Sequence, residues 1–269
     1  MKEINLVMSG SGFNYPIYIG SYKALYEKGY RIKSVTGTSG GSIIAALLAV
    51  GYTEPDEIER ALMETIPSEN KLIDLSWIPF RRHGLIKGAK ILKVLDRTLM
   101  GKTFKEVEID LNIVATNYNT GVWTLFNKAT TPDVKISDAV RASISIPFVF
   151  APHKINGNWY VDGGIQNNWY VDVYGDVEET IALRCGTSSP SFERIDFSMK
   201  GLYKYIARIV GLMLEGSVSD RVEDAANVHK IWLASPYSFM AYNLTRLQVE
   251  RLVDIGYYET RKEMVAKYG

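Results

Sequence analysis

Cysteine and histidine are scarce in this sequence of 269 residues, which has one cysteine, Cys185, and three histidines. A single cysteine excludes an internal disulfide framework and suits a reducing compartment. The formal net charge is +1, so no excess of basic charge favours nucleic acid as a partner. The longest apolar run, 43–50, is too short to span a membrane, and the run at 4–8 is too short for the core of a signal peptide. We therefore expect a cytoplasmic protein whose membrane contact, if any, is peripheral.

Strand and helix patterns alternate through the first half of the chain, and helices dominate from residue 198 onward. The alternation predicts an α/β fold in which a mostly parallel central sheet is covered by helices on both faces. Apolar residues make up 46% of the sequence, enough for one large core. We expect one domain over 1–269, with a mainly helical part at about 190–269 packing on the rest. The expected strands are 4–8, 32–36, 111–116, 122–127, 158–161, 179–184 and 231–234, and the expected helices are 16–28, 42–50, 55–65, 88–100, 137–143, 198–215, 217–227 and 244–268.

A serine flanked by glycines, Ser39, stands between the strand at 32–36 and the helix at 42–50. With Gly37 and Gly41 it forms a G-x-S-x-G pattern, which at a strand-to-helix turn holds the serine hydroxyl out for nucleophilic attack. Small residues here, Gly40 included, let neighbouring backbone approach closely, and the helix N-terminus favours a developing negative charge. Ser39 is therefore the candidate nucleophile.

An aspartate followed by two glycines, Gly163 and Gly164, ends the strand at 158–161. Asp-Gly is a common hairpin-turn signal, so one interpretation of Asp162 is purely structural. The functional interpretation is that Asp162 leaves the end of the sheet and accepts the proton of Ser39. An aspartate with an ordinary pKa near 4 is a poor base at neutral pH, but a dry pocket that raises the pKa would make it competent.

A histidine is the alternative base. His83, His153 and His229 are the three candidates, and residues in such settings are more often surface or packing residues than catalysts. His229 is the most serious, because a Ser-Asp-His order along the chain is that of α/β-hydrolases. In those enzymes several strands precede the nucleophile, whereas only about one strand precedes the strand of Ser39.

A glycine- and serine-rich loop with Gly10, Ser11 and Gly12 connects the first strand to the first helix. Such a loop can turn several backbone N–H groups to one side, next to a helix N-terminus, and so bind a phosphate or the oxyanion of a tetrahedral intermediate. A dinucleotide loop is disfavoured because Tyr15 occupies the place of the third glycine. A Walker loop is excluded here because no Gly-Lys-Ser/Thr follows.

In this order and at these separations, the loop at 10–15, the Ser39 elbow and the Asp162 turn resemble the patatin-like phospholipase family. Shorter stretches between and after them also resemble the family, so that the resemblance extends over most of the chain. These stretches are 19–25, 84–86, 112–116, 141–147 and 244–257. The resemblance implies a patatin-like three-layer fold with its catalytic region at about 4–175.

The resemblance also implies a reaction. Ser39 would attack an ester carbonyl with Asp162 as the proton acceptor, and water would then hydrolyse the acyl-enzyme. Backbone N–H groups of Gly10, Ser11 and Gly12 would hold the oxyanion. The implied substrates are phospholipids, lysophospholipids or neutral acylglycerols, and the resemblance implies neither a cofactor nor a metal ion.

This chain departs from the family pattern at two positions of the loop. Asn14 stands where the family usually has a cation, and Tyr15 where it has a glycine. The loss of the positive charge indicates weaker stabilisation of an oxyanion or a changed head-group preference. It leaves two alternatives to a hydrolase open: a lipid-binding protein of this fold with weak or lost catalysis, and an acyltransferase in which an alcohol or thiol replaces water.

Two helices carry surface patterns that bear on partners. Lys90, Lys93 and Arg97 share one face of the helix at 88–100, which indicates a solvated face or, alternatively, contact with an anionic membrane. In the helix at 198–215 an apolar stripe predicts core packing, with a lid, membrane or dimer surface as the alternative. That stripe comprises Leu202, Tyr205, Ile206, Ile209, Leu212 and Met213. Nothing in the sequence predicts the oligomeric state.

Overall fold

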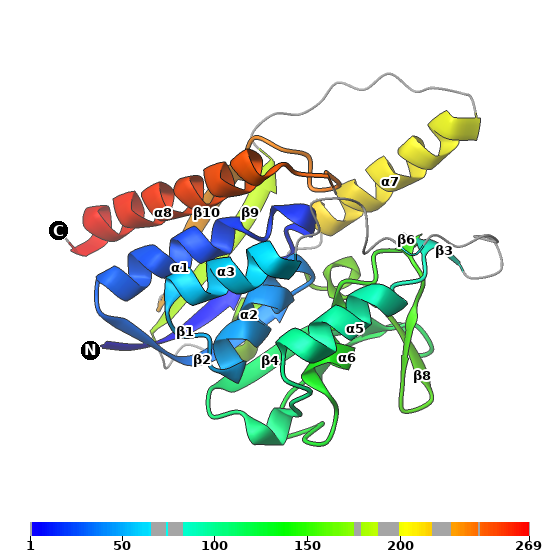
Figure 1. The fold of residues 1–269 in the computed structure, drawn as a ribbon, viewed down its shortest axis with the longest axis horizontal. Coiled ribbons are helices and arrows are strands. Elements are labelled where there is room, and N and C mark those ends of the chain that lie inside the picture. Colours follow the sequence, from blue (N-terminus) through cyan, green and yellow to red (C-terminus); the bar gives the residue numbers. More distant parts are fainter. Residues whose placement is uncertain are drawn as a thin grey trace.

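A central sheet organises the molecule in the computed structural model, which describes residues 2–65, 74, 83–174, 179–187, 199–216, 227–241 and 243–268. Its strands are β1 (Lys2–Met8), β2 (Tyr30–Thr38), β4 (Asp110–Asn117), β5 (Val122–Phe126), β7 (His153–Ile155), β8 (Asn158–Asp162), β9 (Thr180–Thr187) and β10 (Val228–Ser235). The order across this eight-stranded sheet is β10-β9-β1-β2-β4-β8-β7, and β5 also pairs with β4 (Figure 1).

The sheet is mostly parallel. β1 pairs in parallel with β2 and β9, β2 with β4, and β9 with β10. β8 runs antiparallel to β4, and β5 and β7 add further antiparallel pairs. Thr38 lies opposite Val114, and the next residue of β4, Ala115, lies opposite Asp162. The register therefore places the ends of β2 and β8 close together on either side of β4.

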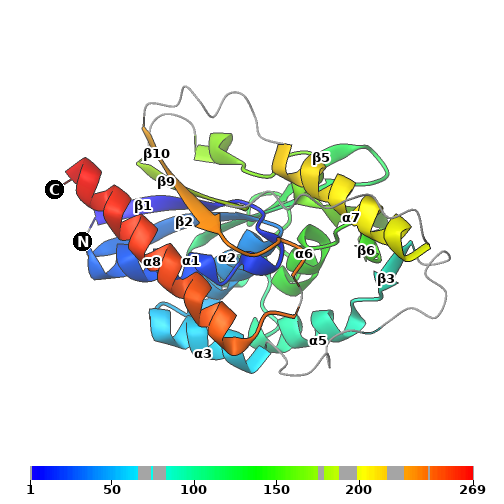
Figure 2. The ribbon, with the colours of Figure 1, turned by 90° about the horizontal axis from the view of Figure 1, so that it is seen from above.

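Helices cover the sheet because its strands are apolar on both faces. Leu6 and Met8 of β1 point into the main core, whereas Val7 packs on the other face against Trp169 and Val171. The helices are α1 (Ile17–Glu27), α2 (Gly40–Val50), α3 (Pro55–Thr65), α5 (Ala89–Thr98), α6 (Ile136–Ser143), α7 (Met199–Gly216) and α8 (Arg246–Tyr268). Figure 2 shows α1, α2, α3 and α8 together on the face of the sheet that carries the main core. The predicted α/β fold class is confirmed.

The expected elements are present wherever the structure describes them, with shifted ends. α2 begins at Gly40 rather than at residue 42, since both glycines after Ser39 are helical. α6 begins at Ile136, one residue before the expected start, so Ser137 lies inside the helix and its Oγ donates a hydrogen bond to Asp96 Oδ1. The predicted helix at 217–227 lies, apart from Asn227, outside the described residues. The short strands β7, β3 (Gly84–Ile86) and β6 (Phe148–Phe150) were not predicted, because three residues carry no periodic pattern.

Helix α7 packs on the fold by one face and leaves the other open. Ile206, Val210 and Leu214 join a second apolar cluster with residues of β3 and β6. The other face of α7 exposes four side chains of the predicted stripe, at 39–54%: Tyr205, Ile209, Leu212 and Met213. The prediction that the stripe packs in the core is therefore wrong for these four. The side chain of Leu202 lies outside the described residues. Within the described chain, no helix combines the length and apolar character that crossing a bilayer requires.

Candidate active site

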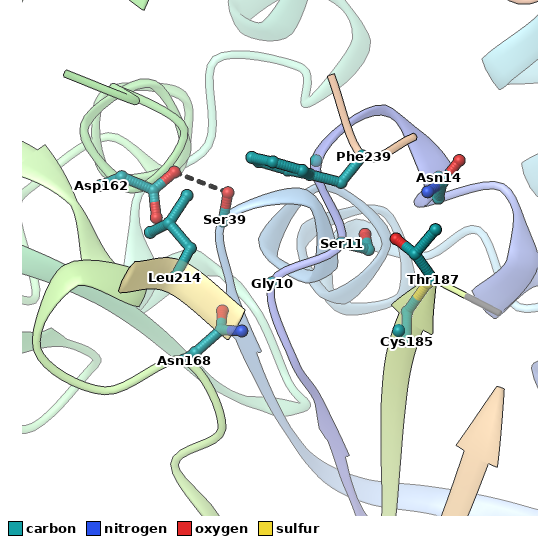
Figure 3. Close-up of a pocket in the computed structure, with 12 residues that line it drawn as sticks. Gly10, Ser11, Asn14, Ser39, Asp162, Asn168, Cys185, Thr187, Leu214 and Phe239 are labelled. Atoms are coloured by element: carbon teal, nitrogen blue, oxygen red, sulfur yellow. Dashed lines mark hydrogen bonds between the residues drawn. The ribbon is translucent and has the colours of Figure 1, made fainter. Parts of the chain in front are cut away.

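The structure brings together the two side chains that the sequence singled out as nucleophile and base. Ser39 Oγ donates a hydrogen bond of 2.6 Å to Asp162 Oδ2 (Figure 3). Both residues are buried, Ser39 at 4% exposure and Asp162 at 0%. A serine hydroxyl in direct contact with a carboxylate can pass its proton to that carboxylate without an intermediate group.

Ser39 occupies a strained turn between β2 and α2. Its φ of 49° and ψ of −124° lie in a region that residues with side chains rarely adopt. The glycines around it are required by close backbone contacts. A Cβ on Gly37 would lie 2.6 Å from the carbonyl oxygen of Gly41, and one on Gly41 would lie 2.6 Å from that of Met8. The elbow therefore needs the small residues that the pattern supplies.

Asp162 is fixed by its position at the end of β8. Its Oδ1 accepts a hydrogen bond of 2.8 Å from the N–H of Gly164, so the carboxylate caps a 3₁₀ turn, η3 (Gly163–Ile165). The Asp-Gly-Gly sequence thus forms a helical turn rather than a hairpin. Gly163 has no room for a side chain, since a Cβ would collide with the carbonyl oxygen of Val114.

Burial raises the pKa of the Asp162 carboxyl from its ordinary value of 3.8 to about 7. Loss of water destabilises the charged form, and this effect outweighs the hydrogen bonds from Ser39 and Gly164, which lower the pKa. A carboxyl that titrates near neutral pH is matched to general-base catalysis there.

The glycine- and serine-rich loop after β1 presents two unengaged backbone donors beside Ser39. The Gly10 N–H already donates a hydrogen bond of 3.0 Å to the carbonyl oxygen of Asn168, which departs from the expectation that Gly10 would hold an oxyanion. The N–H groups of Ser11 and Gly12 have no acceptor among the described residues. Gly10 instead lets the loop lie close to Asn168, since a Cβ on Gly10 would collide with the side-chain oxygen of Asn168.

Asn14 and Tyr15, the two departures from the family pattern, both have structural roles. Asn14 is buried and its Nδ2 donates a hydrogen bond of 3.0 Å to the carbonyl oxygen of Tyr237, which follows β10. Tyr15 packs on the main core, and burial raises the pKa of its hydroxyl to about 12. Asn14 thus ties the loop to the C-terminal part of the sheet.

A small cavity opens beside Ser39. Its volume is about 30 Å³, which leaves room for water molecules but for nothing much larger. Besides the predicted residues, the lining comprises Asn168, Cys185, Gly186, Thr187, Leu214 and Phe239, and Figure 3 shows Leu214 and Phe239 on either side of Ser39. The sequence analysis missed these six because they come from four segments far apart in the chain and form no local pattern.

None of the three histidines lines this cavity. His153 Nε2 lies 2.8 Å from Asp138 Oδ1, and His229 lies in β10, which β9 and β1 separate from β2. His83 precedes β3 in a turn. The geometry therefore disfavours the Ser-Asp-His alternative. In the described part of the chain, no three histidine, cysteine or acidic side chains gather as metal ligands.

The fold and site define an α/β protein whose elbow serine contacts an aspartate directly. The sequence matches the patatin-like phospholipase family over residues 6–173, and the chain belongs to this family. An uncharacterised protein of Acanthamoeba polyphaga mimivirus is 30% identical, over 97% of this chain and 93% of that protein. A probable lipid hydrolase of Invertebrate iridescent virus 6 is 33% identical, over 62% of each chain. VipD from Legionella pneumophila has the same fold, with a TM-score of 0.63 and 18% identity over 99% of this chain and 67% of VipD.

Proposed function

We propose that this protein is a serine lipid acyl hydrolase, of the phospholipase A or lysophospholipase type, that cleaves fatty acyl esters with Ser39 and Asp162 as a catalytic dyad. One observation carries the proposal: a strained elbow serine donates a 2.6 Å hydrogen bond to a buried carboxylate whose pKa is about 7. Membership of the patatin-like phospholipase family supports it.

The first half of the reaction transfers the acyl group to the enzyme. Asp162 Oδ2 takes the Ser39 proton as Oγ attacks the ester carbonyl. The N–H groups of Ser11 and Gly12 hold the oxyanion, and the first turn of α2 adds a favourable dipole. When the tetrahedral intermediate collapses, the ester C–O bond breaks and the departing alcohol receives the proton from Asp162. Water then attacks the acyl-enzyme as Asp162 takes one of its protons. The bond between Ser39 Oγ and the acyl carbon breaks, Oγ receives the proton from Asp162, and the fatty acid leaves.

A lipid needs more room than the cavity provides. A volume of about 30 Å³ admits a water but no acyl chain, so substrate binding displaces part of the lining. Phe239, on the segment after β10, and Leu214, on α7, are the large apolar side chains of that lining. Their movement would open an apolar path to Ser39.

Peripheral contact with a membrane is part of this proposal. The exposed apolar side chains of α7 belong to the same helix as Leu214, which lines the cavity. A lipid surface that covers them would bring its acyl esters to the mouth of the site. The cations Lys90, Lys93 and Arg97 are also exposed on α5 and would add attraction to anionic lipid.

The test compares the wild type with Ser39→Ala and Asp162→Asn. Fluorophosphonate should label wild-type Ser39, and hydrolysis of p-nitrophenyl esters and phosphatidylcholine should fall at least about a thousandfold in both variants. If the folded wild type is not labelled and hydrolyses esters no faster than its variants, the hydrolase proposal is wrong and the alternative of a lipid-binding protein is favoured. Acyl transfer to added glycerol in preference to water would instead identify an acyltransferase.

A further inference from the structure

The end of helix α6 contacts the backbone of both proposed catalytic residues. Ser143 Oγ accepts a hydrogen bond of 2.8 Å from the N–H of Ser39. Two residues later, the carbonyl oxygen of Ser145 accepts one of 2.9 Å from the N–H of Asp162. Besides the sheet register, a segment of three residues therefore links the backbone of the nucleophile to that of the base.

The Ser143 hydroxyl has its hydrogen-bonding direction fixed. It is fully buried and donates its proton to the carbonyl oxygen of Val114 at 2.6 Å. Val114 lies in β4, opposite Thr38 of β2. Since the proton of Ser143 points to the sheet, an oxygen lone pair is left for the Ser39 N–H.

The N–H of Ser39 needs this acceptor. Ser39 lies at the N-terminal end of α2, where N–H groups have no partner within the helix. Its strained backbone persists only if the surroundings hold it. Without Ser143, a buried N–H would lose its partner and the strained turn would lose a restraint at the residue that carries the nucleophile.

Arg141 anchors the same segment. Its Nη1 donates a 2.6 Å hydrogen bond to Ser145 Oγ, and its Nε and Nη2 donate to the backbone carbonyls of Gly88, Lys87 and Ala151. Arg141 is 1% exposed. The end of α6 is therefore fixed to the connection between β3 and α5 and to the residue after β6, independently of the catalytic residues, and it can serve as a rigid reference for them.

We propose that Ser143 is a positioning residue: its hydroxyl holds Ser39 in the strained conformation that directs Oγ at Asp162. The role in turnover rests on the proposed function, whereas the hold on the Ser39 backbone does not. Ser143 does not line the cavity beside Ser39, so its loss should slow the chemical step and leave substrate binding unchanged.

The kinetic test uses Ser143→Ala, Ser143→Thr and the control Ser137→Ala. Ser137 is also a buried serine of α6, with its hydroxyl bonded to Asp96 and away from the site. Ser143→Ala should lower kcat about 10- to 100-fold with KM unchanged, and the pH midpoint near 7 should stay because the surroundings of Asp162 are kept. Ser143→Thr, which retains a hydroxyl, should recover most of kcat, and Ser137→Ala should keep the wild-type value.

Amide hydrogen exchange tests the contact without relying on activity. In Ser143→Ala the Ser39 N–H should exchange at least about tenfold faster than in the wild type, while its rate in Ser137→Ala is unchanged. Wild-type protection of this amide in folded Ser143→Ala, or a loss of kcat in Ser137→Ala equal to that in Ser143→Ala, would overturn the inference. A wild type that hydrolyses no ester would refute the proposed function, and the exchange rate would still decide whether Ser143 holds Ser39.

Discussion

Ser39 Oγ and Asp162 Oδ2 lie 2.6 Å apart although 123 residues separate them in the chain. Each residue is placed by its own strand, Ser39 after β2 and Asp162 at the end of β8, and β4 lies between these strands. The contact orients the hydroxyl towards the carboxylate, whereas burial of Asp162 raises the energy of the charged form and with it the pKa of the group that accepts the proton.

The dependence of hydrolysis on pH should follow Asp162. Only the ionised carboxylate can accept the Ser39 proton, and its pKa is about 7. We expect kcat/KM for a soluble ester to rise about tenfold per pH unit below pH 7 and to level off above it. A rate that stays constant down to pH 5 would contradict the assignment of this carboxylate as base.

Asp162→Asn should change how stability depends on pH. The folded pKa, about 7, lies above the ordinary 3.8, so the folded state binds this proton more tightly than the unfolded state. The contribution of Asp162 is therefore most favourable below pH 4, declines between about pH 4 and 7, and is constant above. Asparagine removes this decline, so the variant should gain stability relative to the wild type as pH rises, by up to about 4 kcal/mol at pH 8.

Urea unfolding from pH 4 to 8 measures the difference, with Asp96→Asn as the control. The hydrogen bond from Lys135 lowers the pKa of Asp96, so that carboxylate stabilises the fold above its unfolded pKa and loses this effect as pH falls. Its pKa is at or below 3.8 in both states, so Asp96→Asn should show almost no pH trend between pH 4 and 8. The same pH trend in Asp162→Asn and Asp96→Asn would contradict the raised pKa.

Gly12→Ala should disable the oxyanion loop. Gly12 has a φ of +56°, and a Cβ there would lie 2.6 Å from Phe239 Cδ2 and collide with the Phe239 carbonyl oxygen. The loop would have to shift, and with it the N–H groups of Ser11 and Gly12. We expect kcat to fall by about 100-fold, as when an oxyanion donor is lost.

The control for this change is Gly101→Ala. Gly101 also has a positive φ, +62°, but its Cβ would meet open space, so only the backbone strain is shared. Its kcat for a soluble ester should stay at the wild-type value. An equal loss of kcat in Gly12→Ala and Gly101→Ala would show that the effect comes from strain and stability rather than from the loop.

Charges on the open face of α7 should weaken binding to vesicles. A Leu212→Glu/Met213→Glu double variant changes two side chains that are 47% and 54% exposed. We expect reduced co-sedimentation with phosphatidylcholine–phosphatidylglycerol vesicles and unchanged hydrolysis of a soluble ester. Leu247→Glu on α8, at 75% exposure, is the matched control and should bind like the wild type. Equal loss of binding in both variants would contradict a specific lipid-facing role for α7.

Local patterns predicted the elements well where residues repeat with a clear period. The apolar runs of β1 and α2 and the glycines around Ser39 fixed the strand–elbow–helix order without tertiary information. The three-residue strands β3 and β6 were not predicted, because they form only by pairing with each other. The exposure of one face of α7 was not predicted either, because an apolar stripe predicts burial and does not identify what covers it.

The sequence by itself determined the fold class, the family and the two side chains of the candidate site, because each depends on residue type and order along the chain. Only the tertiary structure decided that Ser39 touches Asp162, that the Gly10 N–H is already bonded to Asn168, and that Ser143 Oγ accepts a hydrogen bond from the Ser39 N–H. It also decided the raised pKa of Asp162. Distances, burial and the occupancy of hydrogen-bond donors arise between segments far apart in the chain, and no local pattern encodes them.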